Sequence, residues 1–179
     1  MNRFLLPLAG FALLVVVLAI GIRRAPEKGI IASPLLGRAA PEFALPTLAE
    51  PARLVRSRDL RGRWYLFNVW GTWCVECRAE HEMLLKVQRA HVLPLIGLDW
   101  KDDPSEARSW LAQLGNPYEA VAVDATGRTA IDWGVYGAPE TFLVSPQGIV
   151  VYKHVGALTD EVWVHDILPR VAPAPASRS

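Results

Sequence analysis

The sequence predicts an α/β domain in which helices cover both faces of a mixed β-sheet. Two apolar runs of strand length, 64–69 and 92–98, are typical of strands that are buried on both sides. An amphipathic helical pattern follows each run, and a strand, a turn and a second strand are expected near the C-terminus. Three strand–helix pairs followed by a hairpin require both parallel and antiparallel pairing within one sheet.

The helix after the first strand is expected to begin at two cysteines. Its apolar stripe repeats every four residues and consists of Val75, Ala79, Met83 and Val87, widened by Leu84. The segment CVECRAEHEMLLKVQRA therefore places both cysteines in the first turn of this helix.

The later elements carry local boundary signals. Asp103 is expected to cap a helix that has Pro104 at its first position and ends at Gly115. Thr159 is expected to cap the last helix. The remaining expected elements are a strand at 119–123, a short helix at 129–133, and a hairpin of strands 141–144 and 149–154.

Composition excludes several classes of protein. The chain has 179 residues, 51% of them hydrophobic, with 19 basic and 18 acidic side chains and two cysteines. Such a chain is neither a disordered tail nor a small domain held together by disulfides. Its formal net charge of +1 provides no cationic field for phosphates, so nucleic acid is not expected as a partner.

The N-terminal segment predicts a transmembrane anchor. Residues 4–22 form a run of 19 residues without a charge, which is long enough to cross a bilayer as a helix. A cleaved signal peptide is the main alternative, but the run ends at RRAP rather than at a small-x-small cleavage site. The expected organisation is an anchor at 1–22, a linker at 23–36, a domain at 37–170 and a disordered tail at 171–179.

Cys74 and Cys77 form a C-x-x-C pair at the amino end of the expected helix. The positive end of the helix dipole and unpaired backbone N–H groups stabilise a thiolate at this position. We expect Cys74 to be the exposed nucleophile and Cys77 to resolve a mixed disulfide. The negative charge of Glu76, between them, disfavours the thiolate, so we expect the pair to act as a reductant.

A metal site is the alternative interpretation of the same segment. Cys74, Cys77 and His81 have the spacing C-x2-C-x3-H, and a distant fourth ligand would complete a zinc or copper site. A copper metallochaperone is therefore a competing function, although His81 is otherwise expected on the surface of the helix. Haem attachment is excluded because Arg78, not a histidine, follows the second cysteine.

The tryptophans divide into two groups. Trp70 and Trp73 flank the cysteine pair and are expected to shape its surface, with Trp73 contacting the substrate. Trp64, Trp110 and Trp163 stand in apolar surroundings and are expected in the core.

Four segments together resemble one known family. They are WGTWCVECRAEHEML, WKDD, SWLAQLGNPY and GVYGAPETFLVSPQGIVVYKHVGAL, and they resemble the membrane-anchored thioredoxin-like reductases of cytochrome c maturation, the CcmG/DsbE family, over about 37–168. The resemblance implies a thioredoxin fold and a thiol:disulfide oxidoreductase that needs no cofactor. Its substrate would be the disulfide of the haem-binding C-x-x-C-H motif of apocytochrome c, reduced directly or through a partner thiol protein. A membrane electron donor of the DsbD/CcdA type would re-reduce it.

The resemblance also assigns roles to residues. The active-site pair of the family corresponds to Cys74 and Cys77, and a loop at 134–138 precedes the proline that is cis in the family, Pro139. The backbone of Ala138 would then pair with an extended substrate peptide as an added strand. The implied substrate-binding residues are Trp73, Tyr136, Ala138, Pro139 and Glu140.

Glu80 and Glu140 correspond to acidic residues of the groove in this family. Glu80 follows Cys77 by three residues and could relay the proton of the Cys77 thiol. The alternative, with equal weight, is that Glu80 is an ordinary acidic residue near the start of a helix, without a catalytic role. Asn68 stands where ordinary thioredoxins have an aspartate six positions before the first cysteine, and an amide cannot titrate, so the relay must come from elsewhere. A narrow groove around Tyr136 and Glu140 would argue against a broad-specificity thiol reductase, the third candidate function.

The charges around the anchor and the resemblance disagree on topology. One basic residue precedes the uncharged run and three follow it closely, which by the positive-inside rule places the domain in the cytoplasm. The resemblance implies the periplasm, where cysteines of haem-binding motifs become oxidised. We follow the resemblance and expect a single-pass protein of the inner membrane with its catalytic domain on the periplasmic side.

Overall fold

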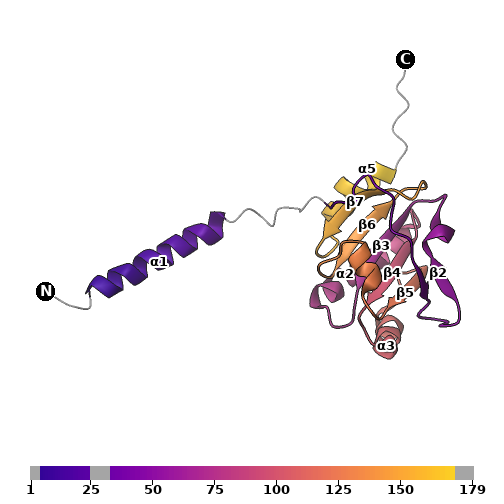
Figure 1. Cartoon of the computed structure of the whole chain (residues 1–179), viewed down its shortest axis with the longest axis horizontal. Coiled ribbons are helices and arrows are strands. Elements are labelled where there is room, and N and C mark those ends of the chain that lie inside the picture. The colour runs from indigo at the N-terminus through magenta and orange to yellow at the C-terminus, as the bar shows by residue number, and fades with distance from the viewer. Residues whose placement is uncertain (1–4, 25–32, 172–179) are drawn as a thin grey trace, which may run out of the picture. The chain divides into compact units, whose positions relative to one another are not determined.

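The computed structural model describes residues 5–24 and 33–171, which belong to two separate units (Figure 1). The first unit contains one helix, α1 (Leu5–Arg24), and the second is an α/β domain. Within the described residues, no helix combines the length and the apolar character that crossing a membrane requires. Residues 1–4, most of the expected linker (25–32) and nearly all of the expected tail (172–179) lie outside the described residues.

A mixed five-stranded sheet forms the centre of the domain. Its strands lie in the order β5-β4-β3-β6-β7. Strands β3, β4 and β5 are parallel to one another, whereas β6 is antiparallel to both β3 and β7. The strands are β3 (Tyr65–Trp70), β4 (Leu95–Trp100), β5 (Ala120–Asp124), β6 (Glu140–Val144) and β7 (Val150–Val155).

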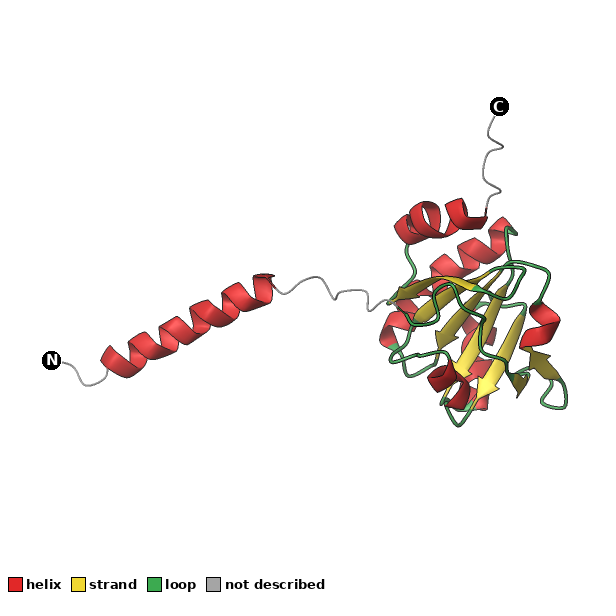
Figure 2. Cartoon of the chain, turned by 45° about the horizontal axis from the view of Figure 1, so that its top comes forward, coloured by secondary structure: helices red, strands yellow, loops and turns green. Residues whose placement is uncertain are grey.

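Helices cover both faces of this sheet, as the sequence predicts (Figure 2). One face packs against α2 (Val75–Ala90), α3 (Pro104–Leu114) and the C-terminal helices, a π-helix η2 (Val162–Ile167) and α5 (Leu168–Val171). The other face packs against α4 (Arg128–Asp132) and the segment that precedes β3. We refer to these as the α2 face and the α4 face of the sheet.

The segment before β3 holds elements that the apolar patterns do not predict. A small antiparallel sheet joins β1 (Ala44–Pro46) to β2 (Leu54–Arg56), and a 3₁₀ helix η1 (Ser57–Leu60) follows. Leu35, at the end of the expected linker, already packs against the apolar cluster of the α4 face. These strands have three residues each, which is too short for a period-2 pattern to be recognised.

Most predicted boundaries are confirmed by the hydrogen bonds that end each element. The Asp103 carboxylate accepts the N–H groups of Ser105 and Glu106 at 2.7 and 3.4 Å, which caps α3, and Gly115 ends it with φ of 92°. The Thr159 hydroxyl accepts the N–H of Val162 at the start of the last helix.

One strand differs from its prediction in a way that affects the site. The apolar run at 92–98 places the strand too early, because β4 begins at Leu95 and continues through Asp99 and Trp100. The carboxyl group of Asp99 therefore lies inside the sheet, opposite Trp70 at the end of β3, the strand that leads to the cysteines.

Candidate active site

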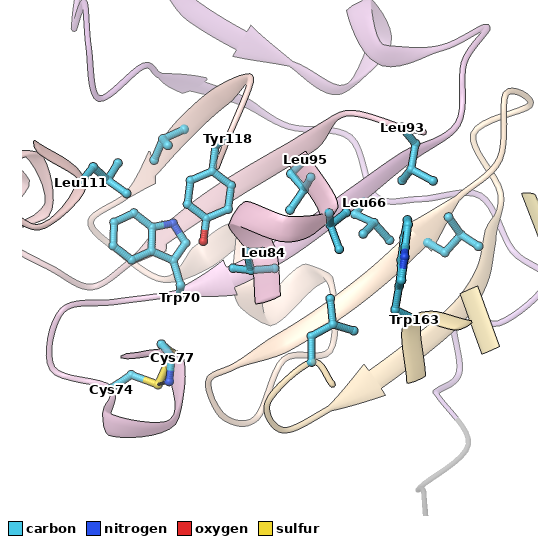
Figure 3. Close-up of a cluster of buried hydrophobic side chains, with 14 of the residues drawn as sticks. Leu66, Trp70, Cys74, Cys77, Leu84, Leu93, Leu95, Leu111, Tyr118 and Trp163 are labelled. Carbon is cyan, nitrogen blue, oxygen red and sulfur yellow. Dashed lines mark hydrogen bonds between the residues drawn. A yellow bond between two sulfur atoms is a disulfide. The ribbon is translucent and has the colours of Figure 1, made fainter. Parts of the chain in front are cut away.

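The cysteine pair lies at the amino end of α2, as predicted. Cys74 is the N-cap residue, and its Sγ accepts the backbone N–H of Cys77 at 3.0 Å. The two sulfurs are joined in a disulfide, which lies at one end of the apolar cluster of the α2 face, near Trp70 (Figure 3). A thiolate at Cys74 would keep the same N–H donor and the positive end of the helix dipole.

The expectation that Cys74 is exposed is wrong for this disulfide form. Cys74 and Cys77 are 5% and 3% exposed, because both sulfurs belong to the buried cluster. The exposed surface at the motif comes instead from their neighbours, with Trp73 52% and Val75 84% exposed. A partner that approaches the disulfide meets these two side chains first.

The two tryptophans beside the motif have different places. Trp73 is half exposed and donates its Nε1–H to the carbonyl oxygen of Trp100 at 3.1 Å. Its ring packs edge-on against the indole ring of Trp100. Trp70 is buried and stacks on Tyr118 at 5.5 Å, so the expectation that it shapes the surface is wrong. Trp70 faces inward because it is the last residue of β3, on the α2 face of the sheet.

Glu80 is a buried acid one turn beyond Cys77. Its carboxylate accepts hydrogen bonds from the side chain of Asn68 at 2.9 Å and from the backbone N–H of Leu158 at 2.7 Å. Burial nevertheless raises the pKa of Glu80 to about 7, with a small further contribution from the charge of Glu76. A group that is half protonated near neutral pH can both accept and return a proton.

Asn68 connects Glu80 to the sheet. Its Nδ2 donates to Glu80 and to the hydroxyl of Thr141 at 3.0 Å, and its Oδ1 accepts the hydroxyl of Tyr118 at 2.8 Å. Asn68 is thus a hydrogen-bonding support for the acid, in agreement with the inference that proton relay comes from another residue. The contributions of Tyr118, Thr141 and Leu158 were not predicted, and the only signal in the sequence is the polar Asn68 within an apolar strand.

The loop at 134–138 leads into β6 at the same end of the sheet from which β3 leads to the cysteine pair. Val69 pairs with Glu140, so the end of β3 and the start of β6 lie at the same edge. The bond between Ala138 and Pro139 is cis, and Ala138 packs against the cluster that contains both sulfurs. Within the part of the chain that the structure describes, the backbone N–H and carbonyl of Ala138 have no hydrogen-bond partner.

Glu140 does not line an open groove. It is fully buried and forms an ion pair with Lys153 at 2.9 Å, while its other oxygen accepts the N–H of Tyr136 at 3.2 Å. The Lys153 ammonium also donates to the carbonyl of Gly134 at 2.9 Å and lies 4.7 Å from the centre of the Tyr136 ring. The structure therefore places Glu140 as a support of this loop, not as a group that touches substrate.

Lys153 is a residue of the site that the sequence did not reveal. A lysine in a strand near the C-terminus gives no sign of burial in the sequence. Its partners are distant along the chain: the Glu140 carboxylate lies in β6, and the Gly134 carbonyl lies in the loop before it. Tyr136, by contrast, is 59% exposed and precedes Ala138 by two residues, and its predicted contact with substrate stays a prediction.

His81 is buried, so its expected place on the helix surface is wrong. Its Nε2–H donates to the carbonyl of Gly115 at 2.9 Å, and its Nδ1 accepts the indole N–H of Trp110 at 3.5 Å. Burial also lowers the pKa of His81, which favours the neutral ring. Both ring nitrogens are occupied, and among the described residues no group of three His, Cys, Asp or Glu side chains is arranged to hold a metal ion.

Two cysteines held this way have thiol–disulfide exchange as their chemistry, and the domain is a thioredoxin-like thiol:disulfide oxidoreductase. The model of the AhpC/TSA family matches residues 36–153. Curated relatives named thiol:disulfide interchange protein DsbE are 43% identical in Allochromatium vinosum, over 96% of this chain and 93% of that one, and 45% identical in Yersinia pestis, over 92% and 89%. The chain belongs to the DsbE family.

Solved structures agree with this assignment. A protein of Chlorobium tepidum described as DsbE is 30% identical, with a TM-score of 0.61 over 69% of this chain and 86% of that one. A secreted thiol-disulfide isomerase of Corynebacterium glutamicum has a TM-score of 0.63 over 74% of this chain and 84% of that one. At 20% identity, the second likeness supports the fold alone.

Proposed function

We propose that this protein reduces the disulfide of the haem-binding C-x-x-C-H motif of apocytochrome c, directly or through a partner thiol protein, during the biogenesis of c-type cytochromes. The observation that carries the proposal is the unpaired backbone of Ala138, a residue that packs against the apolar cluster containing the disulfide. An unfolded apocytochrome segment is an extended peptide, and such a peptide can add to this edge as a strand. The exposed rings of Tyr136, in the same loop as Ala138, and of Trp73, next to Cys74, offer apolar contacts.

The reaction follows from the order of the two cysteines along α2. In the reduced protein, the Cys74 thiolate attacks one sulfur of the substrate disulfide, and the other substrate sulfur leaves as a thiolate. Cys77 then loses its proton and attacks the Sγ of Cys74, which releases the second substrate sulfur. The substrate gains two electrons, and the protein is left with the Cys74–Cys77 disulfide that the structure contains.

Glu80 serves the second step in this proposal. Cys77 has to lose a proton before it attacks, and Glu80 lies one turn further along the same helix with a pKa of about 7. The two hydrogen bonds from Asn68 and Leu158 hold the carboxylate in place whether or not it is protonated. Re-reduction by an electron donor of the DsbD/CcdA type would run the same steps backwards.

We further propose that residues 1–22 anchor the protein in the inner membrane, with the catalytic domain in the periplasm. Support comes from the uncharged run at 4–22 and from the direction of the chemistry, because haem-binding cysteines become oxidised in that compartment. A reporter enzyme fused after residue 36 tests the topology. Reporter activity on the cytoplasmic side alone would overturn it.

Trapping with a Cys77→Ser variant tests the substrate. Without Cys77, the mixed disulfide at Cys74 persists and its partner can be identified by mass spectrometry. We expect peptides that contain the C-x-x-C-H motif, or one thiol protein of haem ligation. A Cys74→Ser, Cys77→Ser double variant is the control for binding that is not covalent.

A matched pair of peptides separates this function from a broad-specificity reductase. The reduced wild-type protein is offered two oxidised peptides of equal length. One contains the C-x-x-C-H motif, and the other has two cysteines at the same spacing within an unrelated sequence. A clear preference for the first supports the proposal, whereas equal rates, or trapped partners that simply follow protein abundance, would contradict it.

A further inference from the structure

Lys153 is a buried cation on the last strand of the sheet. Strand β7 ends the order β5-β4-β3-β6-β7 and lies next to β6 (Figure 1). A lysine on such a strand usually extends into water, yet the Lys153 side chain is 4% exposed, and its ion-pair partner Glu140 is fully buried. Burying two charges is costly, and apolar residues of similar size often give an equally stable fold. The pair is therefore better explained by what it holds in place than by stability.

The contacts of Lys153 lie on both sides of Ala138 along the chain. Before Ala138, the ammonium donates to the carbonyl of Gly134 at 2.9 Å and lies 4.7 Å from the centre of the Tyr136 ring. After Ala138, it forms the ion pair with Glu140 at 2.9 Å. The second carboxylate oxygen of Glu140 accepts the N–H of Tyr136 at 3.2 Å, so the pair joins the two ends of the loop.

The backbone of this loop has few partners. Of the N–H groups at 136–138, only the first has an acceptor in the part of the chain that the structure describes, and that acceptor is the Glu140 carboxylate. Beyond the loop, the carbonyl of Pro139 accepts the N–H of Gly156 at 2.9 Å. The backbone of Ala138 thus stays unpaired between two fixed points, and one of these points is held by the partner of the buried ammonium.

Lys153 is not placed to act on the sulfurs directly. It is paired with Phe142 of β6, so both side chains lie on one face of the sheet, and the ammonium lies 5.1 Å from the centre of the Phe142 ring. Phe142 belongs to the apolar cluster of the α4 face, whereas Cys74 and Cys77 belong to that of the α2 face. Because its side chain is buried, Lys153 is out of reach of a partner as well. Any influence on the reaction passes through the loop.

We propose that Lys153 is a positioning residue that makes the protein selective for disulfides in extended peptides. Paired with Glu140, it holds the loop at 134–138 so that the Ala138 backbone and the exposed Tyr136 ring are ready to receive a peptide strand. A loop that is fixed before binding loses little conformational entropy when the peptide pairs with it, so the peptide binds more tightly. The inference rests on the peptide pairing of the proposed function, and it does not depend on which peptide is the substrate.

Single-turnover reduction of two kinds of disulfide tests the proposal. The reduced full chain is mixed with increasing concentrations of the oxidised C-x-x-C-H peptide, or with hydroxyethyl disulfide, which has no peptide backbone to pair with Ala138. Acid quenching followed by mass spectrometry gives the rate at which substrate thiols form. The peptide series yields a limiting rate and a half-saturating concentration, and the small disulfide yields a rate constant that reports on the cysteines alone.

Variants of the ion pair separate the role of the cation from folding. Lys153→Met should raise the half-saturating peptide concentration roughly tenfold and leave both the limiting rate and the rate with hydroxyethyl disulfide unchanged. The Lys153→Met, Glu140→Gln double variant has no unpaired buried charge and should show the same rise, even if Lys153→Met alone fails to fold. Lys153→Arg keeps a cation beside Glu140 and should bind the peptide almost as the wild type does. Lys86→Met, which breaks an exposed ion pair with Asp160, is the matched control and should behave as the wild type.

A half-saturating concentration of the double variant equal to that of the wild type would overturn the proposal. So would an equal loss of rate with both disulfides, since the pair would then support the cysteines or the fold. An arginine variant as impaired as the methionine variant would exclude the role of the cation. The same series with the oxidised peptide of unrelated sequence keeps the proposed function apart. If the wild type reduces both peptides equally, the apocytochrome substrate is refuted, whereas the ratio of variant to wild type still measures the effect of Lys153.

Discussion

The stability of the disulfide form should depend on pH through Glu80, and a Glu80→Gln variant should remove that dependence. Burial raises the pKa of Glu80 from 4.5 to about 7, and a rise of this size corresponds to about 3 kcal/mol. Because the pKa is raised in the folded state, the proton on Glu80 stabilises the folded protein, and this stabilisation is fully present below pH 4.5. It is lost as the pH increases through 7.

The variant carries an opposing cost that does not change with pH. The carboxyl group accepts two donors, from Asn68 and from Leu158, and a glutamine amide can accept only one of them. The other donor would face an NH₂ group, which costs about 1–3 kcal/mol. Glu80→Gln should therefore be less stable than the wild type at pH 4.5, and the difference should shrink or reverse by pH 8.

Urea unfolding of the full chain in the disulfide form measures both effects without interference from thiol titration. The difference in unfolding free energy between wild type and variant should change by about 3 kcal/mol between pH 4.5 and pH 8. Glu82→Gln, an exposed acid on the same helix, should show no such change. A difference that stays constant over this range would refute the assignment of a raised pKa to Glu80.

Three further predictions follow from the same site. Glu76→His should raise the reduction potential by an amount on the order of 20 mV, because it replaces an exposed negative charge between the cysteines. The potential is measured in an equilibrium with glutathione, and an unchanged value would exclude the predicted tuning. Lys153→Met should lower the unfolding free energy by about 3–5 kcal/mol, since it leaves Glu140 buried without its cation. Adding Glu140→Gln should recover part of the loss. If Lys153→Met alone were as stable as the wild type, the ion pair would be dispensable. Trp73→Ala should slow reduction of a peptide disulfide severalfold while leaving the rate with a small disulfide unchanged, and an equal loss for both would mean that Trp73 acts on the cysteines and not on the substrate.

Local patterns predicted the framework of this domain well. The stripe from Val75 to Val87 and the cap at Asp103 depend on residues within one or two turns, so the sequence carries them in full. The position of Cys74 and Cys77 at a helix start is also a local property, and it was confirmed. The cis bond before Pro139 was implied only by the family resemblance, because a sequence alone does not distinguish the two forms.

Burial of charged groups was the feature that local patterns missed. Glu140, Lys153 and His81 were expected in the groove or on a surface, or were not singled out, and all three are buried with specific partners. Asp99 lies beyond the apolar run that predicted its strand. A charged residue in a sequence indicates exposure unless its partner is known, and these partners lie on other elements.

The sequence by itself determined the fold class, the dithiol and its place at the start of a helix, because each depends on periodicity or capping over a few residues. Only the tertiary structure decided how the acids around the dithiol are used. Asn68 meets Glu80 across 12 residues and Tyr118 across 50, and Leu158 reaches Glu80 across 78. The pKa of a buried acid is set by the donors and charges that surround it, and in this protein the packing of α2 and the neighbouring loops on the sheet brings those groups together.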